Sequence, residues 1–285
     1  MTHNLTWQIG TLCVTRIQES QDVGLDWVLE NATAENLRQI PWLAPHFMNE
    51  NGEALWSIHA LVVETPTRRI LVDTCVGNDK NLPVPFWNQL QGSFLEDLAE
   101  AGFPPDSIDI VLCTHLHVDH VGWNTTLIDG KWQPTFPNAR YLFARDEWTH
   151  WESQDDDFSK TVLSESVRPI WDAGLVDLVD SDHRVCDEVW FEPSPGHTPG
   201  HVSIRLASGG HEAVITGDMI HHPCQFAHPG WGSPADVDFD RAVATREAFF
   251  ARNAAQPILV IGTHFATPTA GHVVRDGDAY RLEID

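Results

Sequence analysis

Short apolar runs divided by polar segments recur along the chain, and most of them have the length of buried strands. The predicted strands are Leu12–Gln18, Leu55–Glu64, Arg69–Val72, Ile108–Cys113, Arg140–Phe143, Glu188–Phe191, Val202–Leu206, Ala213–Thr216 and Ile258–Ile261. The predicted helices are Phe94–Ala101, which ends before Gly102, the acidic and Trp-rich stretch 146–172, and the amphipathic segment Phe239–Arg252. Strands and helices therefore alternate in two halves, as in an α/β fold.

One segment does not follow this pattern. Residues 20–54 carry several polar, Trp and Pro positions without a strong period, and they predict a long, partly helical N-terminal insertion. The chain contains no internal repeat, low-complexity tract or linker-like change of composition. We therefore expect a single domain spanning residues 1–285.

The charge and the cysteine content of the chain indicate which kinds of partner and which cellular compartment to expect. The formal net charge is −24, with an isoelectric point near 4.8, and such a field repels nucleic acid and anionic lipid surfaces. No apolar run is long enough to cross a bilayer, and the first residues lack the pattern of a secretory signal. The 5 cysteines are scattered, which is typical of reduced thiols. These features predict a cytoplasmic protein that acts on a small molecule, without nucleic-acid or membrane partners.

The most informative segment is Thr114–His120, which follows a predicted strand and reads Thr-His-Leu-His-Val-Asp-His. In an extended chain alternate side chains share a face, so His115 and His117 can reach one ion together. Asp119 and His120 follow where the chain turns away and can reach a second ion. A single His-x-His is more often a loop without metal, but three His and one Asp within six residues favour a metal site.

Three later segments add one candidate ligand each. His197 lies in a Gly/Pro-rich turn, Asp218 follows an apolar run that ends at Thr216, and His264 follows the run Ile258–Ile261. Each residue alone is weak evidence for a metal site, because an Asp after a strand is usually a helix or turn cap and a lone His is usually structural. Their shared position at strand ends, where binding loops gather in α/β folds, favours a common site.

Over residues 70–265 the order and spacing of these side chains resemble the ligand set of the metallo-β-lactamase superfamily. The resemblance implies an αββα sandwich, with two mixed β-sheets and helices outside. It assigns His115, His117 and His197 to a first metal, Asp119, His120 and His264 to a second, and Asp218 as a bridge. Asp73 matches the family's first motif, an acidic residue that supports the ligand loop. Two zinc ions are implied, with manganese, cobalt or iron as alternatives.

The C-terminal third resembles the methyl parathion hydrolase branch, which is close to the quorum-quenching N-acyl homoserine lactonases. The residues that carry this resemblance are Gly217–His221, Gln225, Phe226, Arg241–Val243, Arg246, Phe249, His264, Pro268, Gly271, His272, Tyr280 and Arg281. It implies hydrolysis of lactones or esters and, by analogy with the lactonases, a homodimer. The lactonases carry a catalytic Tyr three residues after the bridging Asp, whereas this chain has His221. We expect His221 or His222 to donate a hydrogen bond or proton instead; the alternative is that His221 only packs against the ligands.

This ligand set suggests a mechanism for the hydrolysis. Two ions would share a hydroxide that attacks the carbonyl carbon of a lactone or carboxylic ester, and Asp119 would orient that nucleophile or pass a proton. The 12 Trp and 13 Phe residues suggest an aromatic-lined pocket for an uncharged, hydrophobic substrate. The candidates for this lining are Trp123, Phe226, Phe265, Trp87 and Phe86.

Several activities of the same fold remain as alternatives. An organophosphate triesterase, a glyoxalase II-like thioesterase and a mononuclear iron persulfide dioxygenase share most of the ligand pattern. The thioesterases hold glutathione with basic residues after the last motif, and this chain has few there. Metal content separates the classes, because two zinc-like ions favour hydrolysis and one iron favours oxidation.

Overall fold

A computed structural model describes residues 4–254 and 256–284. The chain divides into two compact units. Unit 1 comprises Met1–Glu19 and Ile58–Asp180, and unit 2 comprises Ser20–Ser57 and Ser181–Asp285. The prediction of one domain over the whole chain stays a prediction.

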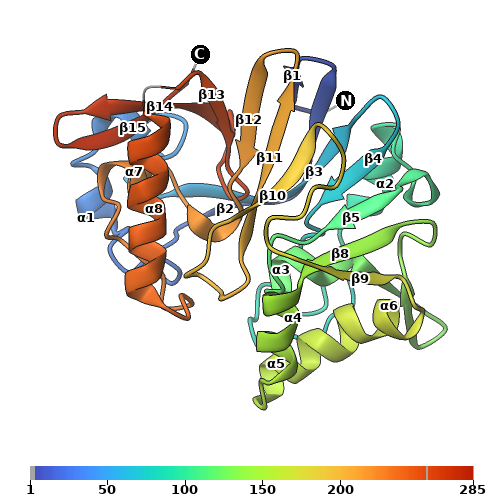
Figure 1. Cartoon of the computed structure of the whole chain (residues 1–285). Coiled ribbons are helices and arrows are strands. Elements are labelled where there is room, and N and C mark those ends of the chain that lie inside the picture. Colours follow the sequence, from blue (N-terminus) through green and yellow to red (C-terminus); the bar gives the residue numbers. More distant parts are fainter. Residues whose placement is uncertain (1–3, 255, 285) are drawn as a thin grey trace. The chain divides into compact units, whose positions relative to one another are not determined.

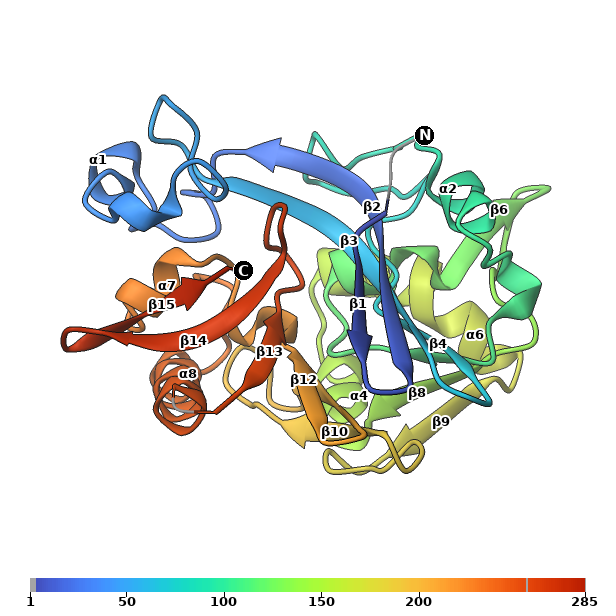
Figure 2. The same ribbon diagram turned by 90° about the horizontal axis from the view of Figure 1, so that it is seen from above.

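The seven-stranded sheet has the order β1-β2-β3-β4-β5-β8-β9 (Figures 1 and 2). Its strands are β1 (Thr6–Ile9), β2 (Leu12–Val23), β3 (Leu55–Glu64), β4 (Arg69–Val72), β5 (Ile110–Leu112), β8 (Arg140–Ala144) and β9 (Val176–Val179). β1 and β2 form an antiparallel hairpin, β3 and β4 are antiparallel, and β4, β5, β8 and β9 run parallel. The sheet is therefore mixed. The parallel strands end on one edge, so loops that follow β4 and β5 lie near each other.

The helices of unit 1 follow these strands. They are α2 (Phe94–Glu100), α3 (Val118–Val121), α4 (Arg145–Glu152), α5 (Asp157–Val162), a π-helical turn (Leu163–Val167) and α6 (Arg168–Asp172), with short 3-10 turns at Pro105–Ser107 and Gly122–Asn124. A separate hairpin joins β6 (Thr125–Ile128) and β7 (Lys131–Pro134) through Asp129 and Gly130, both at positive φ. Asp-Gly suits this two-residue turn because both positions need the left-handed conformation.

The second sheet belongs to unit 2 and has the order β10-β11-β12-β13-β14-β15. Its strands are β10 (Val189–Pro193), β11 (Val202–Ser208), β12 (His211–Ile215), β13 (Ile258–Ile261), β14 (Ala270–Asp276) and β15 (Ala279–Glu283). Only β12 and β13 are parallel, so this sheet is also mixed. The helical elements of the unit are α1 (Ala34–Leu37), α7 (Cys224–Ala227), α8 (Phe239–Asn253) and 3-10 turns at Pro41–Leu43 and Gly217–Met219.

The predicted fold class is confirmed: two mixed sheets with helices. The predicted bounds of β3, β4 and β13 agree with the structure, and the helix 239–252 corresponds to α8. The insertion 20–54 contains α1 and a 3-10 turn. The sequence pattern did not predict β1, the hairpin β6–β7, β9, β14 or β15, which are short, half-exposed or joined by tight turns.

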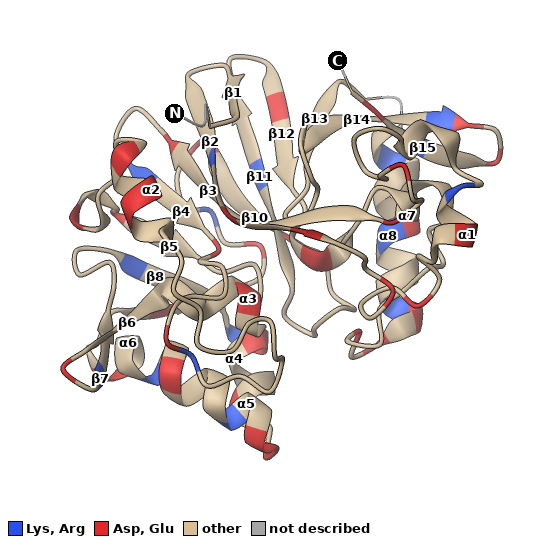
Figure 3. Cartoon of the chain, turned by 180° about the vertical axis from the view of Figure 1, so that it is seen from behind, with Lys and Arg blue, Asp and Glu red and all other residues tan. Residues whose placement is uncertain are grey.

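Asp and Glu positions, coloured red on the ribbon of Figure 3, occur on helices and loops of both units, whereas Lys and Arg positions are fewer and scattered. Within the part of the chain that the structure describes, no helix combines the length and apolar character that crossing a membrane requires. All 5 cysteines are free thiols, and Cys75, Cys113 and Cys224 are buried.

Candidate metal centre

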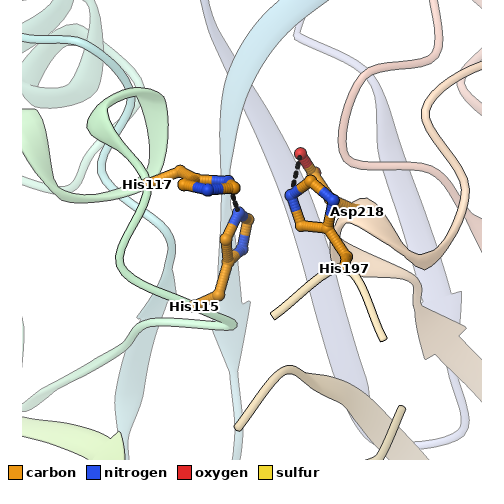
Figure 4. Close-up of side chains that lie close together, drawn as sticks. All are labelled: His115, His117, His197 and Asp218. Carbon is orange, nitrogen blue, oxygen red and sulfur yellow. Dashed lines mark hydrogen bonds and ion pairs between the residues drawn. The ribbon is translucent and has the colours of Figure 1, made fainter. Parts of the chain in front are cut away.

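The His-rich loop of unit 1 begins directly after β5. His115 is buried, His117 is the N-cap residue of α3, and Asp119 and His120 lie within that short helix. The His115 Nε2 and His117 Nδ1 atoms lie 2.9 Å apart, and Figure 4 shows the two rings turned toward each other. Two imidazole nitrogens at this distance share either a proton or a cation. The alternation expected for an extended segment therefore brings the first two candidates together.

Asp73 organises the rest of this loop from the end of β4. Its buried carboxylate accepts hydrogen bonds from the Thr114 backbone N–H at 2.8 Å and from the His120 Nδ1–H at 2.9 Å. The Thr114 hydroxyl also donates to Asp73, and His115 Nδ1 lies 3.1 Å from that hydroxyl oxygen. Both His115 and His120 thus use Nδ1 for orientation and keep Nε2 for a ligand. Asp73 itself has φ of 58°, which Asp tolerates better than most residues.

A close backbone approach allows the Asp73 loop to meet α3. The Gly122 N–H donates to the Cys75 carbonyl oxygen, and a Cβ on Gly122 would lie 1.7 Å from the Val76 carbonyl oxygen. Only glycine fits such a position without moving the backbone. Gly122 is therefore part of the structure that fixes the ligand loop.

Unit 2 holds the other three candidates on separate elements. Asp218 lies in the 3-10 turn after β12, and His264 follows β13. The His264 Nε2 atom is 3.0 Å from Asp218 Oδ1, and His197 Nε2 is 3.5 Å from Asp218 Oδ2. Figure 4 shows the His197 ring directed at the Asp218 carboxylate. The Asp218 carboxylate thus lies between two imidazoles, and all three side chains are buried.

His197 and His264 of unit 2 are oriented through Nδ1, as His115 and His120 are in unit 1. His197 Nδ1–H donates to the buried Asp236 carboxylate at 2.8 Å, and His264 Nδ1–H donates to the Ser57 carbonyl oxygen at 3.2 Å. Burial raises the pKa of Asp236, but the hydrogen bond from His197 and the nearby imidazoles outweigh it, so that pKa is lowered. A carboxylate behind a histidine is a common outer partner of a metal ligand.

Two further contacts fix the turns that carry the candidate ligands Asp218 and His197. His201 Nε2 accepts the Asp218 backbone N–H at 2.9 Å, which ties the Asp218 turn to the residue before β11. Gly196, at φ of 136°, lets the His197 turn lie against α8, because a Cβ there would be 2.3 Å from the Ala242 nitrogen. The strand-end placement read from the sequence is therefore held by specific backbone contacts.

His221 and His222 differ in what their rings do. His222 is buried, its Nε2–H donates to the Phe47 carbonyl oxygen, and its Nδ1 accepts the Cys224 N–H. Burial lowers the pKa of His222 to about 4. His221 Nε2 lies 3.4 Å from Asp218 Oδ2, burial lowers its pKa, and its Nδ1 has no partner among the described residues. Of the two, His221 is the one placed beside a candidate ligand.

The aromatic residues expected in a pocket lie in different environments. Phe226 and Phe265 are fully buried within unit 2 and pack against each other. Trp123 is 3% exposed; it stacks on Phe94 and donates its indole N–H to a buried carboxylate. Trp87 is buried, whereas Phe86 is 54% exposed. The pocket assignment stays a prediction, and burial favours a packing role for all of them except Phe86.

Sequence reasoning missed the residues that hold the ligands in place. They are Asp236 and His201 in unit 2 and Glu147 in unit 1. None stands beside a ligand in the sequence, so spacing carried no signal for them. A buried Asp or Glu is uncommon without a partner, and this rule finds Asp236 and Glu147 only once burial is known.

The imidazole nitrogens and carboxylate oxygens of the seven candidate residues suit one or two divalent cations of the zinc type. Unit 1 offers His115, His117, Asp119 and His120, and unit 2 offers His197, Asp218 and His264. Imidazole nitrogens and carboxylate oxygens are the ligands of zinc and related ions. The fixed Nδ1 atoms of His115, His120, His197 and His264 leave Nε2 available for such ions.

Residues 55–277 match the sequence pattern of the metallo-beta-lactamase superfamily. The chain belongs to that superfamily. It is 25% identical over 160 residues to an N-acyl homoserine lactonase from Bacillus cereus, a match that covers 51% of this chain and 56% of that protein. A second lactonase, from a Bacillus species, is 27% identical over 109 residues, or 38% of this chain and 37% of that protein. The matches thus span about a third to a half of those relatives.

Solved structures of the superfamily extend the likeness of fold to the whole chain. AidC, a dizinc quorum-quenching lactonase in complex with the product N-hexanoyl-L-homoserine, is 22% identical. Its TM-score is 0.82, over 99% of this chain and 97% of that one. This likeness shows the metallo-β-lactamase fold, and the chemistry must be argued from the side chains.

Proposed function

We propose that this chain is a dinuclear metal-dependent hydrolase of lactones or carboxylic esters. The observation that carries the proposal is the common orientation of four buried imidazoles, those of His115, His120, His197 and His264. In each, Nδ1 contacts an orienting oxygen and Nε2 faces another candidate ligand. Such preorganisation is typical of metal ligands and is unnecessary for histidines that only fill a core. The superfamily pattern covers all of these residues.

We further propose that the two ligand groups act as one centre. His115, His117 and His197 would hold the first ion, Asp119, His120 and His264 the second, and Asp218 would bridge them. The Asp218 carboxylate supports this role because its two oxygens already face different imidazoles, His264 and His197. When bound, two divalent ions would make hydroxide available near neutral pH and polarise the substrate carbonyl.

The remaining steps belong to residues of the chain. Asp119 would orient the attacking oxygen or receive its proton, since its carboxylate lies 3.8 Å from His120 Nε2 and is 12% exposed. His221 would donate a hydrogen bond to the carbonyl or leaving oxygen, because burial keeps its ring neutral with one N–H. As the acyl C–O bond breaks, the leaving oxygen would take up the proton received by Asp119, so that the products are a carboxylate and an alcohol.

Exposed apolar side chains near the unit 2 ligands support an uncharged, hydrophobic substrate. Trp27 is 43% exposed and packs edge-on against Trp56, whose ring centroid is 6.1 Å from that of His264. Val237 is 50% exposed, and its backbone N–H donates to the His197 carbonyl oxygen. N-acyl homoserine lactones and aromatic esters combine such an apolar part with a carbonyl.

Metal removal with a substrate screen tests the proposal. Protein stripped by a chelator should lose hydrolysis of acyl homoserine lactones, aromatic lactones and aryl esters, and should regain it with zinc, manganese or cobalt. Metal analysis of the native protein should give two ions per chain. Full turnover after verified metal removal, or one iron with no hydrolysis, would overturn the assignment. Preferential hydrolysis of methyl parathion would indicate that the protein is a phosphotriesterase instead.

A further inference from the structure

Glu147, in the first turn of α4, is a buried carboxylate that the proposed reaction does not use. It is 1% exposed. Its Oε1 atom accepts the Leu116 backbone N–H at 3.0 Å and the Trp151 indole N–H at 2.6 Å. Leu116 lies between His115 and His117, so Glu147 holds the backbone of the ligand loop at its centre.

Trp151 completes the contact with the loop. Its ring centroid is 5.1 Å from that of His117, at an interplanar angle of 76°, and its side chain is buried. The indole edge cannot turn away without breaking the 2.6 Å hydrogen bond to Glu147. Glu147 therefore fixes both the His115–Leu116 peptide and the indole against which the His117 ring lies.

His117 differs from the other candidate imidazoles in the atom that it presents. It turns Nδ1 toward His115 Nε2, whereas His115, His120, His197 and His264 direct Nδ1 to an acceptor. A ring that offers Nδ1 to an ion cannot be oriented by a hydrogen bond from that same atom. Packing against Trp151 supplies an orientation by another route.

We infer that Glu147 and Trp151 are positioning residues that set the ring of His117 and thereby the metal affinity of unit 1. The inference rests on the proposed metal centre. Glu147 does not touch substrate in this scheme, and it acts only through Leu116 and Trp151. Loss of an outer partner of a metal ligand typically lowers metal affinity about 10- to 100-fold.

The test compares Glu147→Ala, Glu147→Gln and Trp151→Phe by zinc competition against a chromophoric chelator. Glu147→Ala should lower zinc affinity about 10- to 100-fold. Glu147→Gln should retain most of it, because an amide oxygen can accept both N–H groups. Trp151→Phe keeps an aromatic ring but removes the indole donor, so its affinity should fall between the two. Among the three variants, the visible spectrum of the cobalt-substituted protein should change most in Glu147→Ala.

Glu152→Gln is the matched control on the same helix. Glu152 is 51% exposed at its side chain and pairs only with Arg168 among the interactions described, so its loss should leave zinc affinity unchanged. A folded Glu147→Ala protein with normal zinc affinity and cobalt spectrum would overturn the inference. If that variant does not fold, normal affinity in Trp151→Phe overturns it. Failure of the wild type to bind zinc would instead overturn the proposed function.

Discussion

The two groups of candidate ligands are built in opposite ways. In unit 1, His115, His117, Asp119 and His120 come from one loop of six residues, and Asp73 orients two of the imidazoles. In unit 2, His197, Asp218 and His264 come from three elements separated along the chain, and each has its own support. In the loop, one residue, Asp73, orients two imidazoles, whereas in the dispersed group each candidate ligand has a separate partner. This difference predicts which substitutions matter most.

The largest effect should come from Asp218→Ala. Asp218 is the residue on which the unit 2 group converges, since both His197 and His264 face its carboxylate. Its removal should lower kcat/KM by more than about 100-fold, the upper range for outer partners, because it removes a proposed ligand itself. Metal analysis and hydrolysis assays measure both consequences. Retention of two ions per chain at normal rate would show that Asp218 is not the bridge.

The second prediction compares the zinc affinities of two variants, each without a carboxylate that orients candidate ligands: Asp73 in unit 1 and Asp236 in unit 2. Asp73→Asn should lower zinc affinity more than Asp236→Asn, both within about 10- to 100-fold. The reason is that Asp73 orients His120 directly and His115 through Thr114, whereas Asp236 orients His197 alone. Chelator competition on the two purified variants gives the ranking. An equal or reversed order would mean that the loop does not concentrate its dependence on Asp73.

The smallest predicted effect is on the free energy of unfolding, and it compares a buried basic side chain of each unit, Lys80 and Arg246. Lys80 of unit 1 donates to the Thr125 hydroxyl and the Glu165 carbonyl oxygen, and its Nζ lies 3.6 Å from the Trp132 ring centroid. Burial lowers the pKa of Lys80 to about 7. In unit 2, Arg246 is buried and donates to the Met219 and Pro229 carbonyl oxygens. A guanidinium stays charged near neutral pH, even where burial lowers its pKa.

These two cations should respond differently to pH. The unfolded chain holds the Lys80 proton up to a pKa of 10.5, so between pH 7 and 8.5 it binds more protons than the folded chain. The free energy of unfolding should therefore rise by up to about 2 kcal/mol relative to Lys80→Met in that interval. Arg246→Met should show a difference from wild type that is independent of pH. Urea titrations at several pH values measure both, and a flat Lys80 difference would contradict the prediction.

The sequence predicted much of the fold because its signals are local. β3, β4 and β13 are continuous apolar runs between polar residues, and α8 has a regular apolar stripe. The hairpins β6–β7 and β14–β15 were missed because they depend on cross-strand pairing and on two-residue turns, Asp129-Gly130 and Gly277-Asp278, rather than on strong apolar runs. The spacing of the His-rich loop likewise predicted the close pair His115 and His117, because alternation along an extended chain is a local property.

By itself, the sequence determined the α/β class, the strand ends and the candidate ligands, since periodicity and residue type depend on near neighbours. Only the tertiary structure decided which residues orient those ligands. Asp236 lies 39 positions from His197, and Glu147 lies 31 positions from Leu116. Burial and hydrogen bonding between such distant residues arise from packing, which no short window of sequence contains.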